Sequence, residues 1–286
     1  MRSPNNQAYA AAISAALLWA TPLLWSAAAL GQSDQGFCRR HHPWGGFDPG
    51  AWKHVRVVTE TLDPDGTLTG TSTTDTRTLL VDAGAETLTL RQSVTVEVAG
   101  KRFEAEPKTV VQGFCGQRPG QSVQFSEPRS AEVTIEQRAI DCRVQRLTID
   151  GQSTRTVTNV YFSDEIEPHV LKRETIVTDP KDDQLISEST TEVLALNMPF
   201  RVLTEIHTTA QLRTVHKHPK GTVVTTTVHS PEVPGGVIAH WSKELDKRGN
   251  VVRRSTLELL DYGLSSEEVR TGLFGRRRRR VLRSNN

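Results

Sequence analysis

Apolar and polar residues alternate along much of the chain with a period of two, the period of a β-strand that buries one face. The run from Val94 to Val98 reads VTVEV, and Gly100 follows it as a turn. The stretch from Phe200 to Lys217 is also compatible with helical spacing, but its many threonines and its cleaner polar face favour a strand. The pattern therefore predicts a mainly β protein built from antiparallel hairpins.

The second half of the chain repeats itself. Matching positions recur between the segments 163–196 and 230–260, at an offset of 67 positions before a turn and 66 after it. A third, weaker copy lies near residues 49–80. Repeats of this length are typical of units that stack or pair with their copies. We expect copies near 49–112, 132–200 and 201–262 to form one large twisted sheet or open half-barrel of antiparallel meanders. Independent folding of the second half is the two-domain alternative.

Turn residues occupy equivalent places in the three copies. Asp-led turns at 63–66, 179–183 and 246–250 each lie between two β-like runs, which indicates hairpins. In 131–144 we favour a hairpin through Glu136–Arg138, with a helix as the alternative. Ser265 and Glu268 have the spacing of a capping box and predict a short C-terminal helix, which Gly272 would end.

The N-terminus has the order of a secretory signal. Arg2 precedes an apolar run, and small residues follow up to Gly31. We expect residues 1–31 to be a signal peptide and the mature chain to be periplasmic or extracellular; an uncleaved membrane anchor is the alternative. Residues 32–48, rich in Gly, His and Pro, predict an extended leader. The β-repeat domain is expected at 49–264, and a short helix and Arg-rich tail at 265–286.

The chain has three cysteines, which in an oxidising compartment is most simply one disulfide and one thiol. Cys38 and Cys115 share the context QGFC, but connectivity cannot be deduced from spacing. We prefer Cys115–Cys142, because it closes a short loop within the β region and such a loop contributes roughly 3 kcal/mol by chain entropy.

The net charge of +2 conceals a mildly acidic body with a basic tail. The tail carries a run of five arginines: Arg276, Arg277, Arg278, Arg279 and Arg280. Export and the absence of interleaved aromatic residues argue against nucleic acid as a partner. We expect contact with anionic lipid headgroups or an anionic envelope polymer. A solvated extension without a role is the alternative.

Metal chemistry has one candidate site. His216 and His218 would leave the same face of a strand, and His229 would oppose them across a hairpin, which is a set that zinc or copper could use. Lys217 and Lys220 beside them oppose a cation, so we expect solvated histidines and no metal. The sequence of Asp63 to Gly66 resembles the start of a calcium loop but lacks the later acidic ligands, so a plain turn is expected.

Catalytic signatures are not apparent. No serine lies in a G-x-S-x-G motif, and a pairing of Cys142 with a histidine is less expected than a disulfide or buried thiol. No Gly-rich phosphate loop is present, and Gly235–Gly236 after Pro234 reads as a bend. We assign no catalytic residue and no cofactor.

Two segments, NVYFSDEIEPHVLKRETIVTD at 159–179 and TVHSPEVPGGVIAHWSKELD at 227–246, resemble the half-barrel sheets of lipoprotein-carrier and related periplasmic lipid-binding proteins. The chain also resembles uncharacterised secreted bacterial proteins built from the same unit. The first resemblance spans about residues 49–262 and implies a concave apolar face that holds acyl chains. This chain departs from that family in its internal duplication and its polar, Thr-rich strands.

The sequence therefore predicts an exported, non-catalytic binding or structural protein of the cell envelope or extracellular space. A half-barrel carrier of a lipid or other hydrophobic ligand is the second hypothesis. An exported hydrolase is the third. They differ in what the concave face should carry: an apolar cavity for the carrier, and converging titratable groups for the hydrolase.

Overall fold

The computed structural model describes residues 35–119 and 121–265. One helix and fifteen strands follow one another along the chain: α2 (Gln35–His41), β1 (Trp52–Leu62), β2 (Leu68–Ala83), β3 (Thr87–Val98), β4 (Lys101–Glu104), β5 (Lys108–Gly113), β6 (Ser122–Phe125), β7 (Arg129–Ile135), β8 (Arg138–Asp150), β9 (Arg155–Phe162), β10 (Val170–Thr178), β11 (Leu185–Val202), β12 (Glu205–His218), β13 (Gly221–His229), β14 (Val237–Asp246) and β15 (Val251–Gly263). In these residues no helix is long and apolar enough to cross a membrane.

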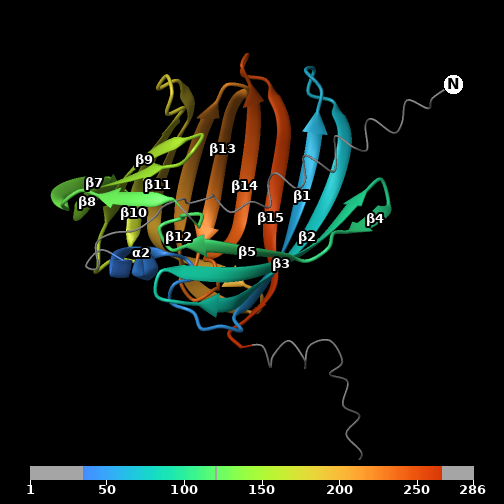
Figure 1. The fold of residues 1–286 in the computed structure, drawn as a ribbon. Helices are drawn as coiled ribbons and strands as arrows, with labels where there is room; N and C mark the ends of the chain where they lie inside the picture. Colours follow the sequence, from blue (N-terminus) through green and yellow to red (C-terminus); the bar gives the residue numbers. More distant parts are fainter. Residues whose placement is uncertain (1–34, 120, 266–286) are drawn as a thin grey trace, which may run out of the picture.

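The strands form one antiparallel sheet that does not close into a barrel (Figure 1). Its order is β4-β3-β2-β1-β15-β14-β13-β12-β11-β10-β9-β8-β6, while β5 pairs with β3 and β7 pairs with β8. Strand β1 inserts between β2 and β15, so the first and last strands of the chain are neighbours. The prediction of a large, open, mainly antiparallel β-sheet is confirmed.

The predicted hairpin turns are present. The side-chain oxygens of Asp63, Asp179 and Asp246 each accept a hydrogen bond from the backbone N–H two residues later, at 2.8–3.0 Å. These turns join β1 to β2, β10 to β11 and β14 to β15, so they lie at one end of the sheet, here called the hairpin end. Glu136 and Gln137, both with positive φ, turn the chain from β7 to β8, which confirms the hairpin expected there.

Two bends of equal construction lie at the opposite end of the sheet. Ser163 and Ser230 each donate a backbone N–H to the carbonyl six residues later, at 2.9 and 2.8 Å. Each serine also accepts, through its Oγ, the N–H two residues later, at 3.3 and 3.4 Å. These bends connect β9 to β10 and β13 to β14, at the positions that the sequence alignment makes equivalent. We call this the closed end, because α2 packs there.

The segment from Phe200 to Lys217 is β-structure, as expected, but it is two strands. The end of β11 and the start of β12 are separated by a turn at Leu203, whose φ is 54°. No glycine or proline marks this turn, which explains why the alternation appeared continuous.

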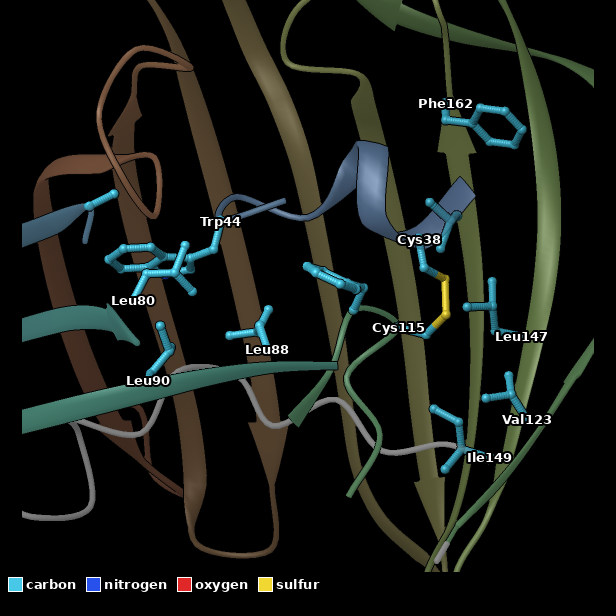
Figure 2. Close-up of a cluster of buried hydrophobic side chains, with 13 residues drawn as sticks. Cys38, Trp44, Leu80, Leu88, Leu90, Cys115, Val123, Leu147, Ile149 and Phe162 are labelled. Carbon is cyan, nitrogen blue, oxygen red and sulfur yellow. A yellow bond between two sulfur atoms is a disulfide. The ribbon is translucent and has the colours of Figure 1, made fainter. Parts of the chain in front are cut away.

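The main hydrophobic cluster lies at the closed end and connects strands near the two opposite edges of the sheet. Leu80, Leu88 and Leu90 of β2 and β3 lie on one side, and Leu147, Ile149 and Phe162 of β8 and β9 on the other (Figure 2). Cys38 and Trp44, from α2 and the turns after it, complete the cluster. The extended leader expected at 32–48 is thus wrong in its described part. The residues from 35 onward form a helix and turns that pack on the sheet, because their few apolar side chains lie between the β2–β3 residues and the β8–β9 residues of this cluster.

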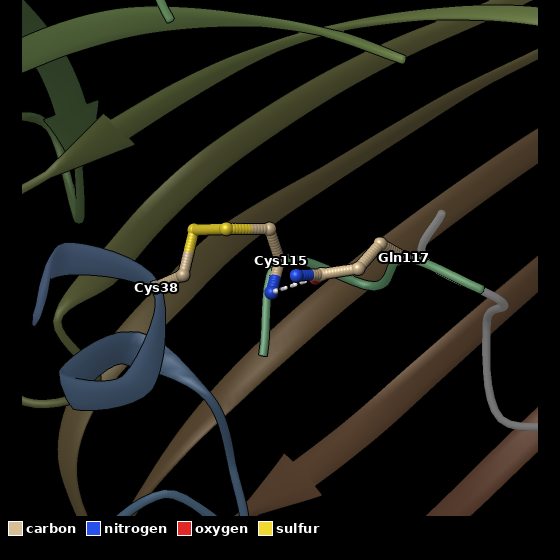
Figure 3. The surroundings of a disulfide bond; sticks show 3 residues. All are labelled: Cys38, Cys115 and Gln117. Atoms are coloured by element: carbon tan, nitrogen blue, oxygen red, sulfur yellow. Dashed lines mark hydrogen bonds between the residues drawn. A yellow bond between two sulfur atoms is a disulfide. The ribbon is translucent and has the colours of Figure 1, made fainter. Parts of the chain in front are cut away.

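The disulfide joins Cys38 to Cys115, with the two Cα atoms 5.0 Å apart (Figure 3). The preferred pairing Cys115–Cys142 is therefore wrong, and Cys142 is a buried free thiol. Cys142 lies in a second cluster with Val133 and Ile135 of β7, away from the first. Gln117 Oε1 accepts the N–H of Cys115 at 3.2 Å and steadies the connection after β5.

Candidate functional site

The two faces of the sheet differ in chemistry. We call the face that contacts α2 the inner face, and Leu80 of β2 marks it. Ser72 lies an even number of residues before Leu80 on the same strand and so faces the same way. Residues paired directly across neighbouring strands also share a face. The register therefore assigns each strand residue to the inner or outer face.

A row of seven hydroxyl side chains crosses the inner face. Its members occupy paired positions on seven consecutive strands from β11 to β2, namely Thr191, Thr214, Thr225, Ser242, Ser255, Thr59 and Ser72. Strands about 4.8 Å apart give this hydroxyl row a length of roughly 29 Å. Thr191 and Thr214 share a hydrogen bond of 3.0 Å, and Thr225 donates one of 3.0 Å to Ser242. The row is a polar strip whose hydroxyl groups partly satisfy one another.

A mixed row lies beside the hydroxyl row, one step nearer the closed end. It consists of Val193, Leu212, Thr227, His240, Leu257, Val57, Thr74 and Val96, again paired strand to strand. Five of these eight residues are aliphatic, so the inner face presents apolar groups next to hydroxyl groups. Many of them are partly exposed. One ion pair, between Arg253 and Glu244 at 3.1 Å, lies on this face nearer the hairpin end.

The outer face carries many ion pairs. Arg56 binds Asp75 through two hydrogen bonds of 2.8 and 2.9 Å, and these bonds lower the pKa of the Asp75 carboxyl. A pocket of about 340 Å³ over β1–β4 is lined by these two residues together with Glu97 and Arg102. Its two positive and two negative side chains balance, so it has no net preference for a charged ligand. The outer face is the solvated side of the sheet.

Three nitrogen-bearing side chains converge at the closed end of the inner face. Lys53 of β1 pairs in register with Thr78 and Tyr262 and extends toward the bend between β13 and β14. Its Nζ donates to the carbonyl of Gly235 at 3.3 Å and lies 5.8 Å from the centre of the Trp44 ring. Burial lowers the pKa of Lys53 to about 8. The ammonium group is therefore recessed in the molecule yet still charged at neutral pH.

The absence of side chains at Gly235 and Gly236 allows these three side chains to pack against the bend. Both glycines have positive φ, 73° and 71°. A Cβ at Gly235 would lie 2.7 Å from Lys53 Nζ and 2.8 Å from Trp44 Nε1, and a Cβ at Gly236 would collide with the imidazole of His229. Side chains at these two positions would therefore displace all three groups. We call Lys53, Trp44 and His229 the basic cluster.

The basic cluster contains polar atoms that have no hydrogen-bond partner among the described residues. His229 Nδ1 is buried and has no hydrogen-bond partner in the described part of the chain. Burial, and secondly the charge of Lys53, lower the pKa of His229 to about 4. Among residues 35–119 and 121–265, Lys53 forms no ion pair with a carboxylate, and the indole N–H of Trp44 donates no hydrogen bond. The arrangement can therefore accept an anionic group.

Positive charge extends beyond this cluster. Burial, and secondly the charge of Arg173 on β10, lower the pKa of His42 to about 3. The N–H of Trp44 donates to His42 Nδ1 at 3.1 Å, which requires that nitrogen to carry no proton. Burial also lowers the pKa of Arg173 to about 9, which still leaves it charged at pH 7. Lys53 and Arg173 are thus two cationic side chains on the inner face that keep their charge at pH 7.

The predicted histidine set does not converge. The rings of His216 and His218 are 5.5 Å apart, but His229 pairs with Ala210, six residues before His216 on β12. At about 3.3 Å per residue that places His229 roughly 20 Å away along the strand. The expectation that His229 opposes the other two is wrong, because the hairpin turns at His218–Gly221. The described residues hold no group of three or more His, Cys, Asp or Glu side chains placed to bind a metal ion.

The free thiol has the wrong environment for a nucleophile. Burial, and secondly the charges of Asp141 and Glu132, raise the pKa of Cys142. The thiolate is the reactive form of cysteine, so this position disfavours attack on a substrate.

Three sequence assignments fall partly or wholly outside the described residues and stay predictions. They are the signal peptide, the helix starting at Ser265–Glu268 and the contact residues Arg276–Arg280.

Sequence reasoning missed the basic cluster, although one signal was available. In the stretch from Ala51 to Val57, positions of one phase read Ala, Lys, Val and Val, so Lys53 stands in the apolar phase of an alternating strand. A lysine in that phase is buried with a partner, extends its ammonium group to the solvent, or binds a ligand. Gly235–Gly236 was interpreted correctly as a bend, but its partners come from other elements and were not visible in the local sequence.

Three solved structures resemble this fold. A protein from Bacteroides fragilis NCTC 9343, thought to be exported and having a YmcC-like fold, is 8% identical, with a TM-score of 0.29 over 75% of this chain and 99% of its own. A protein from Parabacteroides distasonis ATCC 8503, thought to be a lipoprotein, is 11% identical, with a TM-score of 0.29 over 76% of this chain and 97% of its own. A DUF1329 family protein from Desulfovibrio piger ATCC 29098 is 8% identical, with a TM-score of 0.36 over 82% of this chain and 92% of its own.

At identities of 8–11% and TM-scores of 0.29–0.36 this likeness indicates no function. No family model matches the chain, and no curated protein matches it.

Proposed function

We propose that this chain is an exported, non-catalytic binding protein that holds a ligand against the inner face of its sheet. The observation that supports this most is the division between the two faces. Ion pairs gather on the outer face, whereas the inner face combines a hydroxyl row with aliphatic residues that remain partly exposed. A partly exposed surface of this composition across seven strands is suited to a ligand with polar and apolar parts.

Export is supported by two independent features. The N-terminal sequence has the order of a signal peptide. The disulfide between Cys38 and Cys115 is of a kind that persists in oxidising compartments and is rare in the cytosol. Together they support a periplasmic or extracellular location. Contact between the Arg276–Arg280 run and an anionic surface is part of the same proposal.

A carrier of a hydrophobic ligand is the second candidate function. An apolar column on the inner face favours it: Val55 pairs with Leu259, and Val57 with Leu257, along β1 and β15. This column runs from the closed end toward the hydroxyl row. It is narrower than the uniformly apolar face that the resemblance to lipoprotein carriers implies.

Native mass spectrometry of protein purified from its host tests the proposal. We expect a bound small molecule in a fraction of the molecules, and its loss when inner-face residue Leu257 is replaced by Arg. Replacement of outer-face Thr256 by Arg is the matched control and should leave binding intact. Ligand-free protein, together with hydrolysis of an ester, peptide or glycoside probe, would contradict the proposal.

A further inference from the structure

We propose that the basic cluster binds the carboxylate, or a similar acidic end group, of an amphiphilic ligand whose apolar tail lies along the column formed by Val55, Leu259, Val57 and Leu257. This inference rests on the proposed function and names the ligand class for the same face. It makes Lys53 the residue that recognises charge.

The first argument is charge complementarity. Lys53 carries a positive charge in a recessed position, and its described contacts are a carbonyl oxygen and an aromatic ring. An ion in such a place is costly unless it is paired. An anion at this point would satisfy Lys53 Nζ, and the indole N–H of Trp44 could donate to it as well. Two donors on one anion give charge-assisted hydrogen bonds, which are stronger than neutral ones.

The second argument is the construction of the bend. Gly235 and Gly236 carry no side chain, and the nitrogen-bearing parts of Trp44, Lys53 and His229 pack directly against their Cα atoms, where a Cβ would collide with them. His229 Nδ1 faces no described partner. Pro43 holds the bend in place, because its carbonyl accepts the N–H of Gly235 at 3.0 Å. The donors are therefore positioned before a ligand arrives.

The third argument is continuity with an apolar path. Val55 and Val57 follow Lys53 on the same face of β1, and their partners on β15 are Leu259 and Leu257. The distance from Lys53 to Val57 along the strand is roughly 13 Å. Beyond it lie Thr59 and Ser255 of the hydroxyl row. Val55 is buried, whereas Val57, Leu257 and Leu259 are partly exposed. A tail that starts at the basic cluster would thus meet these three aliphatic side chains first and hydroxyl groups last.

Isothermal titration calorimetry at pH 7 with matched probes tests this. The amphiphilic probes are dodecanoate, dodecyl phosphate and dodecanol, which differ only in the end group. Acetate and inorganic phosphate supply the same acidic groups without a tail. For the wild-type chain we expect dodecanoate to bind about 10- to 100-fold more tightly than dodecanol, as a charge-assisted contact would give. Acetate should bind too weakly to measure.

Variants then locate the effect. Lys53→Met keeps an unbranched side chain that is one atom shorter and removes its charge. It should abolish the preference for dodecanoate while dodecanol binds as before. Lys243→Met, on the exposed outer face of β14, is the matched control and should keep the full preference. Trp44→Phe keeps an aromatic ring beside Lys53 but removes the indole N–H, and should reduce the preference partly. Circular dichroism and thermal melting confirm that each variant is folded.

Each alternative result has a distinct meaning. Equal binding of dodecanoate and dodecanol by the wild type, or an unchanged preference in Lys53→Met, overturns the acidic-group site and leaves the proposed binding function standing. Binding of inorganic phosphate that depends on Lys53, without binding of any dodecyl probe, overturns the amphiphile and points to a free anion. Failure of every probe on a folded wild type overturns the whole inference, and native mass spectrometry then judges the proposed function separately.

Discussion

Lys53 and His229 meet at one bend, although β15 and β14 lie between their strands in the sheet. Lys53 Nζ contacts the carbonyl of Gly235, the His229 ring packs on Gly236, and the positive charge of Lys53 helps to lower the pKa of His229. The bend before β14 reaches back over the inner face and brings them together. Because Lys53 keeps its charge in this buried place, the protein without a bound anion is destabilised there.

Removal of the Lys53 charge should therefore stabilise the protein. A pKa lowered from 10.5 to about 8 corresponds to a cost of a few kcal/mol at pH 7. We expect Lys53→Met to raise the free energy of unfolding by roughly 2 kcal/mol, measured by urea denaturation. Between pH 8 and 10.5 the unfolded wild type binds more protons than the folded form, so its stability rises with pH and the gap to the variant closes. A destabilised Lys53→Met would contradict this account.

Mild acid should destabilise the fold through its buried histidines. The pKa values of His42, His229 and His240 are lowered to about 3, 4 and 4, mainly by burial. Below pH 6.5 these histidines bind protons in the unfolded chain but not in the folded chain. The free energy of unfolding therefore falls as the pH falls, by about 1.4 kcal/mol per pH unit for each histidine. We expect a loss of several kcal/mol between pH 7 and pH 5. His240→Gln should make this slope shallower, and an unchanged slope would argue against its burial.

The glycine bend can be tested with a pair of substitutions. Gly236→Ala introduces both a strained φ of 71° and a collision with His229. Gly249→Ala, in the turn before β15, has a φ of 87° but no atom within 4 Å of the new Cβ. Both variants incur the cost of a left-handed conformation, about 1 kcal/mol. Gly236→Ala should lose at least 1–3 kcal/mol more, as expected for an overpacked site. Equal melting temperatures of the two variants would show that the bend accommodates a Cβ at position 236 without displacing His229.

The disulfide should contribute substantially to stability. It closes a loop of 77 residues, for which chain entropy gives about 4 kcal/mol. The double variant Cys38→Ser, Cys115→Ser should lose stability of this order in chemical denaturation. Cys142→Ser, which leaves the disulfide intact, is the control and should lose much less. Thiol counting on the unfolded, non-reduced chain should find one thiol, and peptide mapping should place it at Cys142.

Local patterns were enough to predict the hairpins. The Asp63, Asp179 and Asp246 turns are made by short-range hydrogen bonds, so their sequences specify them. Long-range relations were not accessible in this way. Cys38 finds Cys115 because α2 folds onto the inner face, and that packing depends on Leu80, Leu147 and other residues distant in the sequence. Likewise, nothing near Lys53 in the sequence shows that Gly235 will lie beside it.

The pairing of β1 with β15 has a consequence for the order of folding. Val57 and Leu257 are direct partners although 200 positions separate them. If the chain crosses a membrane N-terminus first, β1 emerges early and one of its edges has to wait for the last strand. Contacts between such distant residues slow folding, and an unpaired edge is prone to associate with other chains. Strand β1 therefore stays open to such association for longer than a strand whose partners are adjacent in the sequence.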